Sequence, residues 1–236
     1  MGKISKRLFG IFLALTLVLN LLPAGLINTS AAYVTGDIIT YGSYPQTNVT
    51  DPGLITALNA QNLQADNTVT YEGAKYLRVY FTQYTDYIGR LTTDPGGTQQ
   101  DENGYFINTA YWFLFEPLQW RVLSVTNGEL FVMSEKILAS KAYNQVGAYL
   151  TWETCTLRTW LNDDFFNAAF NTGEQARIKT SGVVNEDNAY YGTDGGSNTG
   201  DKLFLLSLAE VTNSAYGFYG SDPLNTYDAA RRAQGT

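Results

Sequence analysis

The sequence has 236 residues, of which 44% are hydrophobic and 16% are charged, and its formal net charge is −7. This composition is typical of a globular chain and excludes a disordered or collagen-like one. The sequence contains no histidine and one cysteine. It therefore excludes catalytic triads built on imidazole, most zinc sites, and any disulfide within the chain.

The first 32 residues predict a secretory signal peptide. Lys3, Lys6 and Arg7 precede an uncharged apolar run at 8–22, and small residues close the segment at Ala32. The run is shorter than the ~20 apolar residues that a membrane-spanning helix needs, although an uncleaved anchor is the alternative. We expect cleavage after Ala32, a secreted or bacterial cell-surface protein, and no membrane contact beyond the signal peptide.

Cleavage there leaves a strongly acidic chain, with 12 Lys and Arg against 22 Asp and Glu and a net charge of −10. Such a chain repels phosphate backbones and anionic lipid surfaces. We therefore expect no nucleic-acid partner, and an extracellular glycan or protein as the ligand instead.

The region up to about residue 105 predicts few regular elements. A short strand running into a turn is expected at 37–46, a short helix at 53–59, and a strand at 76–81, where aromatic and β-branched residues are frequent. Gly, Pro, Asp and Asn at 94–104 predict a loop.

A β-hairpin is the strongest local prediction. Apolar runs at 118–125 and 130–134 flank Asn127-Gly128. A tight hairpin turn requires positive φ angles at its two central residues, which Asn and Gly adopt at the lowest cost.

An amphipathic helix is predicted over 154–170, followed by a second short helix. One helical face carries Leu157, Trp160, Leu161, Phe165, Ala168 and Ala169, and the opposite face carries Arg158, Asn162 and Asp163. Thr172 and Gln175 have the spacing of a capping box. Strands are expected at 179–184 and 202–207, joined by a polar loop at 185–201. The mixture predicts an α+β fold in one domain over 33–236, with a separate N-terminal subdomain up to about 105 as the alternative.

No catalytic residue is assigned. Cys155 lies near the start of a predicted helix but has no histidine or second cysteine as a partner, so a structural role is favoured. A glycosidase requires two carboxyl groups about 5 to 10 Å apart, and no spacing singles out such a pair. The acidic residues considered are Glu116, Glu135, Glu153, Asp163 and Asp164.

Two kinds of binding site are considered. The loop carboxylates and amides of Asp187, Asp194, Asn198 and Asp201 are the oxygen ligands that Ca²⁺ prefers, but they lack the EF-hand register, and a metal-free turn is favoured. We therefore expect no cofactor. Aromatic side chains in loops suit sugar stacking, although they also fill cores. The ligand-binding candidates are Trp152, Tyr190 and Tyr191.

Several phrases of the sequence resemble one family. They include Tyr41-Gly42-Ser43-Tyr44-Pro45-Gln46, Leu118-Gln119-Trp120-Arg121-Val122-Leu123, Thr156-Leu157-Arg158-Thr159-Trp160-Leu161-Asn162 and Lys202-Leu203-Phe204-Leu205-Leu206-Ser207. The family is domain of unknown function 6273, which is common in exported and surface proteins of Gram-positive bacteria. The family also resembles, more distantly, the C-type-lectin-like fold of formylglycine-generating enzymes.

The resemblance implies a C-type-lectin-like mixed sheet. The oxidase activity of the formylglycine enzymes is not implied, because it depends on a cysteine pair and Cys155 has no second cysteine. Family members continue after the Ala-Arg-Arg-Ala motif with two further strands, so we expect this chain to be incomplete at the C-terminus. The hairpin or the strand at 203–207 should then present an unpaired edge or an unusually exposed apolar face. The resulting hypotheses are a non-catalytic module that binds glycan or protein, a carboxylate-based polysaccharide hydrolase, and a structural spacer of a larger surface protein.

Overall fold

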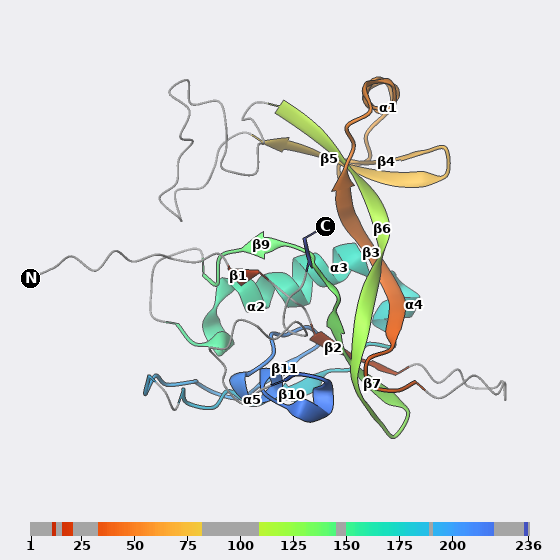
Figure 1. Cartoon of the computed structure of the whole chain (residues 1–236). Coiled ribbons are helices and arrows are strands. Elements are labelled where there is room, and N and C mark those ends of the chain that lie inside the picture. Colours follow the sequence, from red (N-terminus) through yellow and green to blue (C-terminus); the bar gives the residue numbers. More distant parts are fainter. Residues whose placement is uncertain are drawn as a thin grey trace, which may run out of the picture. The chain divides into compact units, whose positions relative to one another are not determined.

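The structure is a computed structural model that describes residues 33–81, 109–144, 150–188 and 191–219 (Figure 1). It also describes the backbone of short strands at 11–12, 16–20 and 234–235. Short helices and antiparallel sheets occur together. The predicted α+β class is therefore confirmed.

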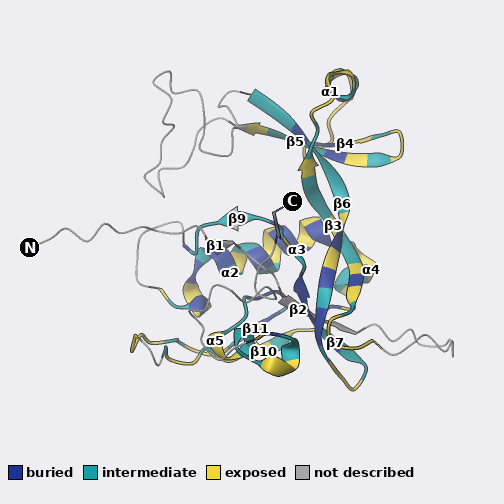
Figure 2. Ribbon diagram, viewed as in Figure 1, coloured by how far each residue is buried: buried dark blue, intermediate teal, exposed yellow. Residues whose placement is uncertain are grey.

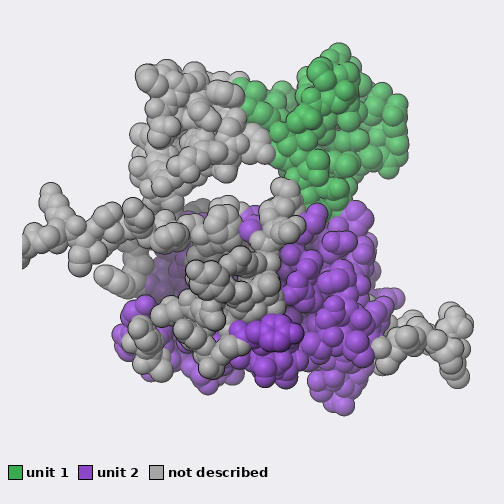
Figure 3. Space-filling view, viewed as in Figure 1, with its two compact units in different colours: residues 1–10, 44–116, 145–147 green, residues 11–43, 117–144, 148–236 purple. Residues whose placement is uncertain are grey.

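The chain divides into two compact units (Figure 3). The described part of the first unit lies within Tyr44–Glu116, and the second contains Ile11–Ser43, Pro117–Asn144 and Ala148–Thr236. Strands β3 (Ile38–Asn48) and β6 (Thr109–Thr126) contribute residues to both units. The described part of the first unit ends at Glu116, beyond the boundary of about 105 that was considered from the sequence.

The first unit packs one helix against antiparallel strands. Helix α1 (Pro52–Asn59) begins at Asp51, whose side chain accepts a hydrogen bond from the backbone N–H of Leu54. Strand β4 (Thr68–Tyr71) pairs with β5 (Ala74–Phe81), which pairs with β6. The helix predicted at 53–59 and the strand predicted at 76–81 are both confirmed. The core of this unit consists of Leu58, Val69, Tyr76 and Trp112.

The predicted hairpin of the second unit is confirmed. Strand β6 turns through Asn127 (φ 53°) and Gly128 (φ 80°) into β7 (Glu129–Ser134). Both φ angles are positive, as a tight turn that matches the strand twist requires. Figure 2 shows buried residues along β6 and β7, and Trp120 is fully buried with its indole N–H donating to the carbonyl oxygen of Tyr41 over 2.8 Å.

The second edge of β7 is also paired. Strand β2 (Thr16–Asn20) lies antiparallel to it, from Thr16 opposite Met133 to Asn20 opposite Glu129. The prediction of an open edge at the hairpin is therefore wrong for the chain as a whole, because residues of the predicted signal peptide cover that edge. Two shorter pairings join β1 (Ile11–Phe12) to β9 (Ser140–Lys141), and β12 (Gln234–Gly235) to β8 (Lys136–Ile137).

The predicted long helix is present as one helical stretch with a wide turn inside it. A 3₁₀ turn, η2 (Trp152–Thr154), precedes α2 (Thr156–Trp160), the π-helical segment η3 (Leu161–Phe165) and α3 (Phe166–Ala169). The wide turn rotates the buried face. Phe166 is therefore buried, whereas Ala168, which was predicted to face inward, is exposed and Trp160 is half-buried. The buried side chains are Leu157, Leu161, Phe165, Phe166 and Ala169.

The next helix begins one residue earlier than predicted. Asn171, not Thr172, is the capping residue of α4 (Thr172–Gln175), and its side chain accepts hydrogen bonds from the N–H groups of Gly173 and Glu174. The Glu174 carboxylate accepts the N–H of Asn171 in return. The prediction of Thr172 and Gln175 as the capping pair is therefore wrong, because Asn and Glu occupy the same spacing one position upstream.

The last strands also differ from the prediction. Strand β10 (Ser181–Val183) lies within the predicted 179–184, but its partner is β11 (Thr199–Asp201), upstream of the predicted 202–207. The backbone N–H groups of Lys202 and Leu203 instead donate to the side-chain oxygen of Asn162, over 2.8 and 3.1 Å. A helix residue therefore takes the hydrogen bonds that a neighbouring strand would need. Helix α5 (Leu208–Val211) and the 3₁₀ turn η4 (Ser214–Tyr216) follow.

Candidate functional site

A cleft of about 1340 Å³ lies within the second unit. Its walls are formed by residues 150–152, by β10 and residues 184–188, by residues 193–195 and by residues 204–210. Ser124, Phe131, Tyr143 and Tyr216 also line it. A concave site of this volume, lined by apolar groups and a few polar groups, is the default binding-site hypothesis.

An aromatic cluster of Phe131, Phe204 and Tyr216 forms part of the cleft wall. The rings of Phe131 and Phe204 are stacked with 6.0 Å between centroids, and Tyr216 meets Phe131 edge-on at 5.5 Å. Burial, and then the carboxylate of Glu210, raises the pKa of Tyr216 above its ordinary value. The phenol therefore stays protonated at neutral pH and can donate a hydrogen bond to a ligand.

The rim of the cleft is apolar and acidic. Three aliphatic side chains that line it are exposed: Leu150 at 38%, Val184 at 58% and Leu208 at 48%. The lining also contains the four carboxylates of Glu186, Asp187, Asp194 and Glu210, and no lysine or arginine occurs among the described lining residues. This arrangement favours ligands that carry apolar faces and either no charge or a positive one.

The polar loop at 185–198 forms one side of the cleft through its own hydrogen bonds. The carboxylate of Asp187 accepts the N–H of Gly195 over 3.0 Å, and that of Asp194 accepts the N–H of Gly196 over 2.8 Å. The amide oxygen of Asn198 accepts the N–H of Asn185 over 2.9 Å. Three of the four residues considered as calcium ligands therefore act as backbone acceptors in this loop.

Close backbone packing explains the paired glycines of the loop. A Cβ atom at Gly195 would lie 2.3 Å from the carbonyl oxygen of Asn185 and 2.4 Å from that of Glu186. Gly196 has a φ of +81°, and a Cβ atom there would lie 2.6 Å from the side chain of Thr151. Gly195 can therefore approach the backbone of residues 185–186, and Gly196 can approach Thr151, only because neither residue carries a side chain.

The fourth calcium candidate, Asp201, is a buried structural group. It is 2% exposed, and its carboxylate accepts hydrogen bonds from Arg158 Nε at 2.7 Å, Trp152 Nε1 at 2.9 Å and the Thr199 hydroxyl at 2.6 Å. Asp201 lines a separate small cavity with Arg158 and Asn162, outside the cleft. Across the described ranges, no group of three or more acidic or cysteine side chains is arranged to hold a metal ion.

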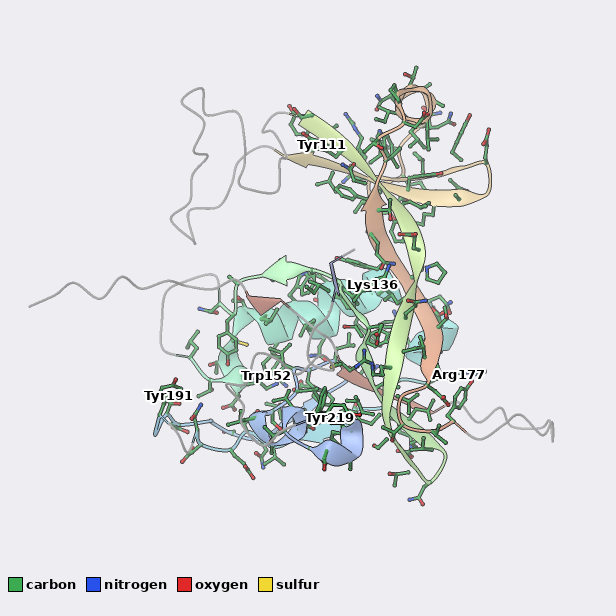
Figure 4. The ribbon with its side chains drawn as sticks, viewed as in Figure 1. Tyr111, Lys136, Trp152, Arg177, Tyr191 and Tyr219 are labelled. Atoms are coloured by element: carbon green, nitrogen blue, oxygen red, sulfur yellow. The ribbon has the colours of Figure 1, made fainter. Side chains whose placement is uncertain are left out.

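The aromatic candidates lie in different places (Figure 4). Trp152 lines the cleft but is 9% exposed, with its indole N–H committed to Asp201. Tyr191 is 69% exposed and is not among the cleft-lining residues, while its backbone N–H donates to Asn188. Tyr190 lies outside the described residues. The structure therefore does not bring Trp152 and Tyr191 together at the cleft.

Cys155 caps a helix. It is 1% exposed, its thiol donates to the carbonyl oxygen of Trp152 over 3.4 Å, and its sulfur accepts the N–H of Arg158 at 3.5 Å. Burial, and then the neighbouring Cys155, raises the pKa of the Tyr143 phenol well above its ordinary range. The Tyr143 phenol therefore stays protonated at physiological pH, and it lies next to Cys155 at the cleft wall.

The carboxylates considered for catalysis do not line the cleft. Glu135 forms an ion pair with Arg121 at 2.6 Å, and Glu116 accepts the hydroxyl of Thr47 at 2.7 Å. Glu153 is exposed, as are Asp163 and Asp164.

Sequence reasoning missed Glu186 and Glu210. The spacing Ser207 to Glu210, a capping box in the structure, was a signal that would have placed Glu210 at the start of a helix.

Among the described residues, no helix combines the length and the apolar character that crossing a bilayer requires.

Comparison with curated proteins found no match, and comparison with solved structures found none either. Residues 127–234 match the model of a family described as a domain of unknown function, DUF6273. This range holds β7, the helices of the second unit and all of the cleft lining except Ser124. The resemblance noted in the sequence is thus confirmed over residues 127–234, which are similar to the DUF6273 family.

Proposed function

We propose that this protein is an exported or surface-displayed, non-catalytic module that binds a glycan without acidic groups in the cleft of its second unit. The observation that carries the proposal is a cleft of about 1340 Å³ whose described lining combines aromatic and exposed aliphatic side chains with carboxylates and amides, and contains no cation. Apolar side chains suit the C–H faces of sugar rings, and carboxylates and amides accept hydrogen bonds from hydroxyl groups. A lectin-like architecture for the second unit is part of this proposal.

The charge of the cleft supports a restricted ligand class. Glu186, Asp187, Asp194 and Glu210 place four carboxylates on its lining. A uronic or phosphate-bearing polysaccharide would therefore meet like charge without a compensating lysine or arginine. Neutral glycans and amino sugars do not meet this repulsion.

A glycan array tests the proposal. We expect the purified full chain to bind neutral or amino-sugar polysaccharides and to leave uronic acid polymers unbound. Leu208→Ser removes an exposed aliphatic group that lines the cleft, whereas Leu63→Ser makes the same change at a 39% exposed leucine of the first unit. Binding that falls about tenfold in the first variant and is unchanged in the second would support the cleft as the site. An equal loss of binding in both variants, or no glycan binding by the wild type, would contradict the proposal.

A polysaccharide hydrolase is the second candidate, because the cleft is concave and carries several carboxylates. It predicts release of reducing sugar ends from a bound polysaccharide. Glu186→Gln and Asp187→Asn should then abolish product formation while binding persists. A bound polysaccharide that stays intact would rule this candidate out.

A further inference from the structure

The outer edge of β7 is occupied by a segment that the predicted export of this protein would remove. Thr16–Asn20 pairs with Met133 through Glu129, and the same N-terminal segment supplies Ile11–Phe12, which pairs with β9. Cleavage after Ala32 would take both strands away. We propose that the outer edge of β7 then becomes an acceptor site for an extended, uncharged aliphatic strand of a partner polypeptide. This inference rests on the proposed export, and it is independent of glycan binding.

The backbone of β7 suits strand addition. All five residues of β2 are in continuous antiparallel register with it, so the edge presents a ladder of N–H and C=O groups to a neighbour. Exposed edges are usually blunted by lysine, proline or a bulge on the edge strand. Strand β7, with the sequence ELFVMS, carries neither lysine nor proline, and the bulge of this hairpin lies on β6 between Val122 and Ser124.

The side chains of β7 indicate what the partner strand must be. Leu130, Val132 and Met133 are 2%, 0% and 6% exposed, and Phe131 belongs to the aromatic cluster of the cleft. Apolar groups therefore occupy successive positions, which point to opposite faces of the sheet. A partner strand needs aliphatic residues on both of its faces, as the run Leu17-Val18-Leu19 provides in this chain.

Charge favours a separate uncharged strand over a second copy of the chain. The single charged residue of β7, Glu129, forms an ion pair with Lys179. The chain that follows Ala32 has a net charge of −10, so two copies repel each other at low ionic strength. An uncharged aliphatic strand does not meet this repulsion, and it gains the same backbone hydrogen bonds.

The test keeps the full chain during folding. A specific protease site is inserted between Ala32 and Tyr33, the folded protein is cut, and the freed segment is washed away in dilute urea. A fluorescein-labelled peptide with the sequence of residues 14–22 and a soluble lysine tail is then added. We expect anisotropy to report one peptide bound per chain. The matched peptide with Val18→Pro, which lacks one backbone N–H, should bind at least about tenfold more weakly.

Cysteine crosslinking tests the register in which the peptide pairs with β7. Val18 lies opposite Phe131, so a peptide with Val18→Cys should form a disulfide with the Phe131→Cys protein. A peptide with Leu17→Cys presents its sulfur on the opposite face and should not. The wild-type protein, which retains the buried Cys155, controls for reaction elsewhere.

Each remaining outcome decides the proposal. If the cut chain loses its near-ultraviolet circular dichroism signal and the peptide restores it, the acceptor site is supported. If the cut chain remains folded and binds no peptide, the proposal is wrong. A dimer that the peptide does not dissociate would show that a second copy covers the edge, and unfolding that the peptide does not reverse would show that no exchangeable site exists.

Discussion

Arg158 and Asp201, 43 residues apart in the sequence, are joined by a hydrogen-bonded ion pair of 2.7 Å between Nε and Oδ1. Arg158 belongs to α2, and Asp201 ends β11, so the pair ties the helix to this strand of the second unit. Trp152 and Thr199 donate to the other oxygen of the same carboxylate. Neutralising this carboxylate should therefore weaken several connections at once.

Asp201→Asn is expected to lower the free energy of unfolding by about 3 kcal/mol, because it leaves the partly buried guanidinium of Arg158 without its counter-charge. Urea denaturation followed by tryptophan fluorescence measures the change. Asp164→Asn removes an exposed carboxylate from the same helical stretch and should change stability by no more than about 0.5 kcal/mol. Similar losses in both variants would contradict the role assigned to Asp201.

Gly42 is expected to tolerate no side chain. It has a φ of +75°, and a Cβ atom there would lie 2.6 Å from the ring of Phe170 and 2.8 Å from the carbonyl oxygen of Ala169. Gly42→Ala should cost about 2–4 kcal/mol, from backbone strain together with the steric clash. Gly36→Ala has comparable strain at φ +96° but meets nothing within 4 Å, so it should cost about 1 kcal/mol. Thermal unfolding of the two variants isolates the contribution of the clash, and equal midpoints would contradict it.

The first unit should lose stability in acid through Asp66. The Thr68 hydroxyl, which donates to its carboxylate over 2.7 Å, holds the pKa of Asp66 below its ordinary value of 3.8. A carboxyl group with a lowered pKa in the folded state stabilises the fold above its unfolded-state pKa, and this contribution is lost as the pH falls through the folded-state pKa.

Carboxyl carbon NMR titration measures the pKa of Asp66 directly. Thr68→Val keeps the volume of a buried side chain and removes the hydroxyl donor, so it should raise the pKa of Asp66 toward 3.8. Its stability should also fall less between pH 5 and about pH 3 than that of the wild type. An unchanged titration curve in Thr68→Val would refute the assigned cause.

The loop wall of the cleft should depend on Gly195. Gly195→Ala places a Cβ atom against the backbone of Asn185 and Glu186 and should separate the two sides of the loop at a cost of about 1–3 kcal/mol. Hydrogen exchange at 185–198 should then become faster. Gly182 also lines the cleft, and a Cβ atom there would meet nothing within 4 Å. Hydrogen exchange at 185–198 in the Gly182→Ala variant should therefore match that of the wild type. If exchange in the loop is the same in both variants, the close approach of Gly195 does not hold this wall.

The elements that could be predicted from the sequence are those with a local physical signal. Asn127-Gly128 marks the hairpin because the turn requires positive φ angles, and Pro52 after Asp51 marks the start of α1. The local sequence pattern does not predict the contacts of Asn162. Its position on the polar side of a helix predicts a solvated residue, whereas its side chain binds the backbone of Lys202 and Leu203.

The candidate site was predicted less completely than the fold. Trp152 and the loop residues Asp187 and Asp194 do line the cleft. Asp201 does not, because Arg158 and Trp152, which are distant in the sequence, enclose its carboxylate. The apolar rim residues Leu150, Val184 and Leu208 come from three separate segments. Their proximity depends on tertiary packing, which no local periodicity encodes.

The buried thiol at the start of α2 makes this protein its own conformational probe. Because Cys155 is the sole cysteine of the sequence and is 1% exposed, a thiol-reactive dye can label it only when the surrounding helix opens. The labelling rate therefore reports the opening of this region without any engineered reporter. A ligand that closes the cleft beside Trp152 would register as slower labelling, even before its chemical identity is known.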